Sequence, residues 1–350
     1  MTVHGGGADG EFVLGVDSGG SGLRAALRVP PGSKAPRDPH ASQGKDASRD
    51  RRLSDPVRSA EPVRTGPRGI DADHFLSQLL PMTEELLERA GGGRITAVAV
   101  GAAGLATLGD DLRATLPSAL GRTLGVRRVA LAADAVTAYA GALGDRPGAV
   151  VAAGTGLIAL GTDLTAWHRA DGWGHLLGDC GGGAWIGRAG LEAAMRAHDS
   201  RRGGSPALLA RAEKLFGPLA GLPGQLYPRT DRPAVLASFA PEVAGCAAED
   251  TVADGILRDA ARHIAEAAQA VCPSTGACEV ALTGGLLNLG EPLLAPLRAE
   301  LAAQLPHARR VPAGGDPLDG ALRIAVDLAA DRLRLPQDTR MLTVHEEGDR

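Results

Sequence analysis

The segment of residues 171–185, DGWGHLLGDCGGGAW, carries the residue types best suited to binding a ligand. It holds six glycines, with two aspartates around Trp173, in a chain with only nine aromatic residues. Glycine lets the backbone come close to a ligand, and a carboxylate held there can bind hydroxyl groups. This segment is therefore predicted to form the wall of a binding site.

Two aspartates can each be interpreted in two ways. Asp134 follows the apolar run 129–132 and begins a predicted helix, so it is either a helix cap or a general base for a substrate hydroxyl. Asp179 is either a turn residue or a carboxylate that binds hydroxyls or orients a metal. His175 is expected to be a hydrogen-bonded structural residue, and Cys180 is expected to be inert.

Three short glycine segments follow predicted strands, at residues 17–21 (DSGGS), 154–156 (GTG) and 283–285 (TGG). Backbone amides in such turns can bind phosphate oxygens. The first segment lies in a predicted β-hairpin and matches neither the G-x-G-x-x-G pattern nor the Walker pattern. One such segment alone is as consistent with an ordinary turn, but three in one chain favour a nucleotide site.

Composition excludes several classes of partner. The 350 residues carry a net charge of −4, which gives no electrostatic reason to expect nucleic acid, and no apolar run is long enough for a membrane span. Four cysteines without a Cys-x-x-Cys pair indicate neither a disulfide framework nor a zinc or iron–sulfur site. Residues 1–10 lack a secretory signal, so a cytoplasmic protein is expected.

Predicted strands and helices alternate, which indicates an α/β fold with sites at the carboxyl ends of the strands. A hairpin is expected over 12–29. Further strands are expected at 95–100, 129–132, 149–153 and 279–283, and helices at 71–90, 182–198, 241–271, from 291 and at 318–333. The polar stretch 30–66 is predicted to be a disordered insertion, because it has few apolar side chains to bury.

In this order, these pieces resemble the N-acetylglucosamine kinase family, which is grouped with the BadF/BadG-type ATPases (BadF/BadG/BcrA/BcrD) in the actin/hexokinase/Hsp70 fold. The most specific match is GWGHLLGD at 172–179, followed by Trp185-Ile186. The resemblance covers about residues 12–330 apart from the insertion. It implies a two-domain, ribonuclease H-like α/β ATPase fold with a cleft between the domains.

The resemblance also implies a division of the chain. The expected parts are a flexible N-terminus (1–11), an N-terminal ATPase-like domain (12–146), a C-terminal ATPase-like domain (147–316), a helix packing back on the first domain (317–335) and a flexible tail (336–350).

By the same resemblance, Asp134 would be the base that takes the proton of a sugar hydroxyl, and Asp17 would lie near Mg²⁺. The ATP phosphates would be bound by Gly19, Gly20, Ser21, Gly154, Thr155 and Gly156, and the adenosine by Gly284 and Gly285. The sugar would be bound by Gly104, Gly172, Trp173 and Asp179. Sugar and ATP are the implied partners, without nucleic acid or membrane, and a homodimer is expected.

The chain departs from the family pattern at three places. Leu157 and Ile158 follow Gly156 where the family commonly has serine, Cys180 replaces a glutamate, and no asparagine stands near residues 66–69. These differences bear on which sugar is bound more than on phosphoryl transfer.

The favoured interpretation is ATP-dependent phosphorylation of N-acetylglucosamine or a related amino sugar or hexose. Two alternatives stay open. One is an ATPase activator of a 2-hydroxyacyl-CoA dehydratase-type system, which would need cysteines for an iron–sulfur cluster. The other is a sugar or nucleotide sensor that has lost catalysis, suggested by Leu157 and Cys180.

Overall fold

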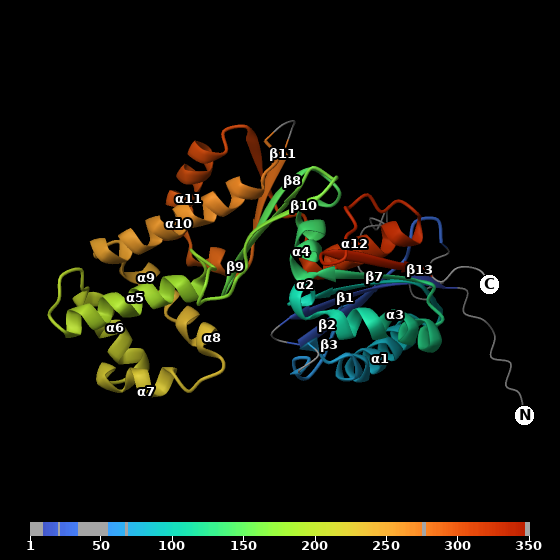
Figure 1. The fold of residues 1–350 in the computed structure, drawn as a ribbon, viewed down its shortest axis with the longest axis horizontal. Coiled ribbons are helices and arrows are strands. Elements are labelled where there is room, and N and C mark those ends of the chain that lie inside the picture. The colour runs from blue at the N-terminus through green and yellow to red at the C-terminus, as the bar shows by residue number, and fades with distance from the viewer. Residues whose placement is uncertain (1–9, 20–21, 34–54, 67–68, 275–277, 347–350) are drawn as a thin grey trace, which may run out of the picture. The chain divides into compact units, whose positions relative to one another are not determined.

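The computed structural model describes residues 10–19, 22–33, 55–66, 69–274 and 278–346. The chain divides into two compact units. The first contains the residues up to 145, residues 164–167 and the residues from 313 onward, and the second contains 146–163 and 168–312. Each unit holds a β-sheet with helices packed on it (Figure 1), so the predicted α/β class is confirmed.

The main sheet of the first unit has the strand order β13-β7-β6-β1-β2-β3. These strands are β1 (Glu11–Gly19), β2 (Gly22–Arg28), β3 (Val57–Arg58), β6 (Arg94–Ala102), β7 (Arg128–Ala133) and β13 (Leu342–Glu346). β6 is parallel to both β1 and β7, whereas β2 runs antiparallel to β1. The predicted hairpin is confirmed as far as the pairing of Gly19 with Gly22, and Gly20 and Ser21 lie outside the described residues.

Helices cover both faces of this sheet. They are α1 (Ala72–Arg89), α2 (Leu105–Leu108), α3 (Asp110–Leu124), α4 (Asp134–Leu143) and α12 (Pro317–Ala329). Figure 1 shows α1 and α3 on one face and α4 and α12 on the other. α12 and α4 cross closely, because a β-carbon on Gly320 would lie 1.8 Å from the carbonyl oxygen of Thr137. A separate small ribbon pairs β4 (Thr65–Gly66) with β5 (Gly69–Ile70).

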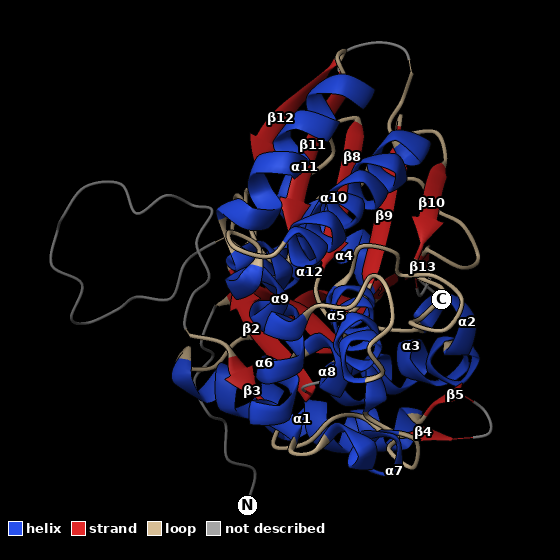
Figure 2. Ribbon diagram, turned by 90° about the vertical axis from the view of Figure 1, so that its left-hand side faces the viewer, coloured by secondary structure: helices blue, strands red, loops and turns tan. Residues whose placement is uncertain are grey.

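The sheet of the second unit has the order β10-β9-β8-β11-β12. Its strands are β8 (Gly148–Ala153), β9 (Leu157–Thr162), β10 (Trp167–Asp171), β11 (Cys278–Thr283) and β12 (Ala308–Pro312). β11 runs parallel to β8 and to β12, so the carboxyl ends of these three strands share one edge. Figure 2 shows the five strands with α10 and α11 in front of them.

The helices of the second unit are mostly short. They are α5 (Gly183–His198), α6 (Pro206–Phe216), α7 (Leu222–Leu226), α8 (Arg232–Ala237), α9 (Ala240–Cys246), α10 (Thr251–Val271) and α11 (Glu291–Gln304), with the 3₁₀ turns η1 (Leu219–Gly221) and η2 (Gly285–Leu289). In neither unit is a described helix both long enough and apolar enough to cross a membrane.

Trp167, the first residue of β10, belongs to the first unit together with residues 164–166, although the stretches on both sides of 164–167 belong to the second unit. Its Nε1 donates a hydrogen bond to the carbonyl oxygen of Pro336 at 2.7 Å. Its ring also packs edge-on against Tyr139, with 5.3 Å between the ring centroids. These contacts explain why residues 164–167 depart from the continuous division expected from the sequence.

Three sequence expectations were wrong in part. The helix expected at 241–271 is broken, because Asp250 caps a new helix by accepting hydrogen bonds from the amides of Val252 and Ala253. The flexible tail expected at 336–350 contains β13, which pairs with the edge strand β7. Two short strands, β3 and β4, form near the C-terminal end of the insertion expected at 30–66, and residues 34–54 lie outside the described part.

Candidate functional site

A tight turn joins β8 to β9 in the second unit. Gly154 donates a backbone hydrogen bond to the carbonyl oxygen of Gly156 at 2.9 Å. The carbonyl groups of Gly154 and Thr155 then accept the amides of Gly183 and Ala184, each at 2.8 Å. Gly183 is the first residue of the 16-residue helix α5, so the turn lies directly against a helix N-terminus. A helix N-terminus carries a partial positive charge and favours anions.

The segment 283–285 lies beside the same turn. Gly284 has a φ of +105°, and a β-carbon there would lie 2.1 Å from the carbonyl oxygen of Ala153, the last residue of β8. A β-carbon on Gly183 would lie 3.6 Å from a methyl carbon of Leu286, in the turn that follows. The structure therefore brings the second and third glycine segments of the sequence together at the carboxyl ends of β8 and β11.

Asp179 also belongs to this cluster. Its carboxylate lies over the turn, because a β-carbon on Gly156 would lie 2.3 Å from Asp179 Oδ2. Only 8% of Asp179 is exposed. Its Oδ1 accepts the amide of Gly174 at 3.0 Å, and its carbonyl accepts the amide of Gly182 at 2.9 Å. Asp179 thus connects the glycine-rich segment to the start of α5.

Asp171 orients this loop, a role that the sequence interpretation missed. Its carboxylate accepts the amides of Asp179 and, at 2.9 Å, of Cys180. Burial raises the pKa of Asp179, the amide of Gly174 opposes that shift, and the negative charge of Asp171 adds to it. The only signal in the sequence was a second carboxylate eight residues upstream in the same segment.

Trp173 is the most exposed ring of the glycine-rich segment, with 63% of its surface accessible. The guanidinium carbon of Arg169 lies 4.2 Å from the Trp173 ring centroid, a cation–π distance. Arg169 also donates hydrogen bonds to the carbonyls of Asp171 and Gly172, at 3.1 and 3.3 Å. Gly172, Trp173 and Asp179 therefore lie in one loop, and Arg169 is a second residue that the sequence interpretation missed.

A mainly apolar cavity of about 340 Å³ borders this loop. His175 and Leu176 of the loop line part of it, so His175 stands beside a cavity rather than in the core. The cavity is completed by side chains of α5, α7 and α8 and the adjoining turns: Arg188, Leu191, Glu192, Met195, Leu222, Pro223, Leu226, Tyr227, Arg232 and Leu236.

In the first unit, Asp17 pairs across the hairpin with Arg24. The Nε and Nη2 atoms of Arg24 donate to Asp17 Oδ2 at 3.0 and 2.5 Å, and Nη1 donates to Asp316 Oδ2 at 3.0 Å. Burial alone would lower the pKa of Arg24, but the two aspartates raise it above its ordinary value. Asp316 also caps α12 by accepting the amide of Asp319 at 2.9 Å.

Asp134 is the first residue of α4, and its side chain is half-buried. Its Oδ1 accepts the amide of Ala135 at 2.9 Å, which orients the carboxylate. The preceding residue, Ala133, occupies the cap position, so Asp134 is not the N-cap itself.

Strand pairing places Asp134 close to two other predicted site positions of the first unit. Ala102 pairs with Ser18 on one side and with Ala133 on the other. Residues 17–18, the segment 101–104 and Asp134 consequently share the carboxyl edge of β1, β6 and β7. Gly104 has a φ of +80° and caps α2 at this edge.

Comparisons with known proteins agree with this arrangement. The model of the BadF/BadG/BcrA/BcrD ATPase family matches residues 14–318. An N-acetylmuramic acid/N-acetylglucosamine kinase of Clostridium acetobutylicum is 38% identical over 82 residues, which are 23% of this chain and 27% of that protein. The chain thus matches only about a quarter of the length of this curated relative.

Solved structures extend the likeness to nearly the whole chain. A crystal structure of a candidate N-acetylglucosamine kinase from Chromobacterium violaceum shares 25% identity and a TM-score of 0.67, covering 90% of this chain and 98% of that one. A glucokinase of the ROK family from Streptomyces griseus, in complex with glucose and AMPPNP, has the same fold at 22% identity and a TM-score of 0.51, with coverage of 91% and 99%. The expected actin/hexokinase-like fold is therefore confirmed, and the chain belongs to the BadF/BadG/BcrA/BcrD ATPase family.

Proposed function

We propose that this protein is an ATP-dependent kinase that phosphorylates a hydroxyl group of an amino sugar, with N-acetylglucosamine as the first substrate to test. One observation carries the proposal. In the second unit, the turn 154–156, the segment 283–285 and the N-terminus of α5 converge, and the loop that holds Asp179 and Trp173 closes on them. Backbone amides suited to binding an anion thus lie next to the carboxylate of Asp179, which is suited to binding hydroxyl groups.

The nucleotide would occupy the glycine segments. Thr155 is exposed at the tip of its turn, and a β-carbon on Gly154 or Gly285 would meet no atom within 4 Å. Open backbone of this kind lets phosphate oxygens approach the amides directly. We assign phosphate binding to Gly154, Thr155 and Gly156, and adenosine binding to Gly284 and Gly285. Gly19 is assigned to the phosphates from the first unit.

Asp17 would hold Mg²⁺, the cation that neutralises the ATP phosphates in phosphoryl transfer. Its residue type fits, because Mg²⁺ prefers carboxylate oxygens and keeps several waters. Arg24 binds Asp17 through Oδ2 alone. Oδ1 accepts no hydrogen bond from the described residues, which leaves a carboxylate oxygen for the cation or its water shell.

Asp134 would act as the general base. The proton of the sugar hydroxyl passes to its carboxylate while the hydroxyl oxygen attacks the γ-phosphorus of ATP, and ADP leaves with the electrons of the broken P–O bond. The half-buried carboxylate is held in one orientation by the amide of Ala135, which suits a positioned base.

The sugar would contact the glycine-rich loop and Gly104. The exposed indole of Trp173 offers an apolar face, and the buried carboxylate of Asp179 can accept hydrogen bonds from sugar hydroxyl groups. The apolar cavity beside His175 and Leu176 would suit the acyl group of an N-acylated sugar. A cytoplasmic location and a homodimer stay predictions.

The test is a coupled assay of sugar-dependent ADP release with the wild type, Asp134→Asn and Asp110→Asn. Asp110 is a matched control because its side chain is 98% exposed and lies outside the site. We expect Asp134→Asn to lose at least about a hundredfold in kcat, and Asp110→Asn to behave as the wild type. Substantial activity in Asp134→Asn would show that another group is the base.

The same samples separate the two alternatives. Trp173 fluorescence should report sugar binding, since its ring is exposed. Sugar binding without any ADP release in the wild type would favour the sensor. Visible absorbance with stoichiometric iron would favour the dehydratase activator.

A further inference from the structure

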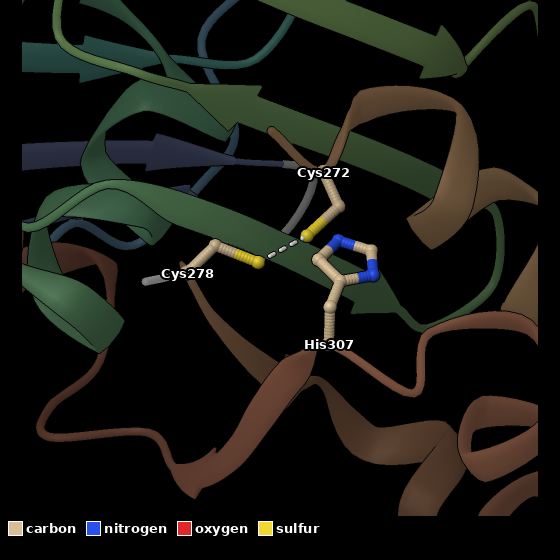
Figure 3. Close-up of side chains that lie close together, drawn as sticks. All are labelled: Cys272, Cys278 and His307. Carbon is tan, nitrogen blue, oxygen red and sulfur yellow. Dashed lines mark hydrogen bonds between the residues drawn. The ribbon is translucent and has the colours of Figure 1, made fainter. Parts of the chain in front are cut away.

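Cys272, Cys278 and His307 come together in the second unit (Figure 3). Their two sulfur atoms and one imidazole nitrogen all lie within 4.8 Å of one another. The Cys272 and Cys278 sulfurs are 2.7 Å apart. Figure 3 shows the His307 ring turned toward the Cys272 sulfur.

Three separate elements of the fold hold these side chains in place. Cys272 is the C-cap of α10, and its amide donates to the carbonyl of Ala268 at 3.0 Å. Cys278 is the first residue of β11 and pairs with Ala308, the first residue of β12. His307 immediately precedes that residue, so the parallel pairing of β11 with β12 brings it beside the cysteines.

The residue types and their exposure fit a transition metal with an affinity for sulfur. Two thiolates and one imidazole are ligands of Zn²⁺, which binds four donors in tetrahedral geometry. Cys278 is buried, Cys272 is half-buried and His307 is exposed, so a cation can enter from the His307 side. The exposed side also gives water access to the fourth position.

We propose that Cys272, Cys278 and His307 form a zinc site. The cation replaces one proton on each thiol, and both protons pass to solvent. Tetrahedral Zn–S bonds of about 2.3 Å require sulfurs roughly 3.8 Å apart, so the two thiols separate by about 1 Å on binding. The hydrogen bond that joins His307 Nε2 to the carbonyl of Pro273, at 3.2 Å, is given up if that nitrogen binds the metal.

The position of the site makes its role structural. Cys278 begins β11 and Thr283 ends it, next to Gly284 of the proposed nucleotide site. At about 3.3 Å per residue the two ends of this strand are roughly 17 Å apart. Zinc would therefore tie the end of α10 to β11 and to the start of β12 without touching the glycine segments. The absence of a Cys-x-x-Cys pair hid this site from sequence analysis.

The experiment uses the full chain after a chelator has removed bound metal, with its thiols kept reduced. Zinc is then titrated into a mixture of this protein and a chromophoric chelator that competes for the metal. Metal content by mass spectrometry and the melting temperature are the readouts, so the result does not depend on kinase activity. We expect one zinc per chain and a higher melting temperature with zinc. Cobalt in place of zinc should give a thiolate charge-transfer band in the near ultraviolet.

Variants locate the cation. His307→Ala changes an exposed side chain and should fold normally, yet weaken zinc binding by about tenfold or more. Cys272→Ser should weaken the cobalt band, because it removes one of the two thiolate ligands. Cys246→Ala is the control, since Cys246 is a buried cysteine outside the cluster. No zinc binding by the wild type, or unchanged binding by both His307→Ala and Cys272→Ser, would overturn the proposal. So would a mass two hydrogens short in the untreated protein, which would identify a Cys272–Cys278 disulfide.

Discussion

The Asp179 carboxylate lies so close to Gly156 that a β-carbon at residue 156 would approach Oδ2 to 2.3 Å. This contact joins the loop that would bind the sugar to the turn that would bind phosphate. A side chain at position 156 would therefore disturb both. The requirement for glycine here is one of space.

Gly156→Ala should destabilise the protein by about 1–3 kcal/mol, because the added methyl group must displace a buried carboxylate. Urea unfolding followed by circular dichroism measures this loss. Gly154→Ala is the control for stability, since a β-carbon at residue 154 meets no atom within 4 Å. An equal loss in both variants would contradict the contact with Asp179.

Asp179→Asn should raise the melting temperature relative to that of the wild type, and this difference should be larger at pH 7 than at about pH 4. Burial, with a contribution from Asp171, raises the pKa of Asp179 in the folded state. An acid with a raised folded pKa contributes stability below its unfolded pKa and loses it as pH rises through the folded pKa. The neutral amide removes that loss and can still accept the amide of Gly174.

Thermal melts of both proteins at several pH values between 4 and 7 check this prediction. The difference in melting temperature should grow as the pH rises. A constant difference would show that ionisation of Asp179 carries no penalty in the fold. If Asp179 also binds the sugar, the variant will be a poor kinase, because a site residue can contribute to activity at the expense of stability.

Arg24→Met should cost about 2 kcal/mol of stability, because it leaves Asp17 and Asp316 without the cation they share. The figure is below that of a fully buried pair, since the Arg24 side chain is 21% exposed and that of Asp316 is 38% exposed. Urea unfolding of the purified variant measures it.

Arg229→Met gives the matched comparison, because Arg229 and its partner Asp231 both have exposed side chains. Their ion pair should therefore contribute little to the stability of the fold. Adding Asp316→Asn to Arg24→Met should restore part of the loss by removing one of the two facing charges. Equal stability of Arg24→Met and Arg229→Met would refute the idea that the shared arginine matters for folding.

Leu226→Trp tests the acyl-group assignment of the cavity. The larger ring should fill space beside the loop and raise the KM for N-acetylglucosamine by about tenfold, while the KM for glucosamine stays nearly unchanged. Leu215→Trp serves as the control, since Leu215 is exposed on α6 and does not line the cavity. A rise in KM for both sugars would mean that the cavity does not distinguish the acyl group.

Local sequence signals are sufficient to predict a helix boundary where a capping residue in the same segment sets it. The helix expected at 71–90 could begin at Asp71 or Asp73, and Asp71 accepts the amide of His74 at 2.9 Å as the N-cap of α1. Asp250 carries the same kind of signal, but the alanine-rich sequence on both sides of it favours one continuous helix. A capping aspartate decided the structure at both positions.

Features that depend on distant residues could not be predicted in this way. β13 forms because β7 offers an unpaired edge, a property of the folded sheet and not of residues 342–346. The anchoring role of Asp171 and the stacking of Arg169 on Trp173 depend on how one loop folds over itself. The meeting of Cys272 with His307 likewise depends on the pairing of β11 with β12.

The placement of Trp167 has a consequence for engineering. Since residues 164–167 lie in the first unit between two stretches of the second, the polypeptide passes from one unit to the other four times. No single cut releases either half intact, and an isolated fragment 146–312 would carry the indole without Tyr139 and Pro336, its partners. Anyone dissecting this protein should start from substitutions rather than truncations.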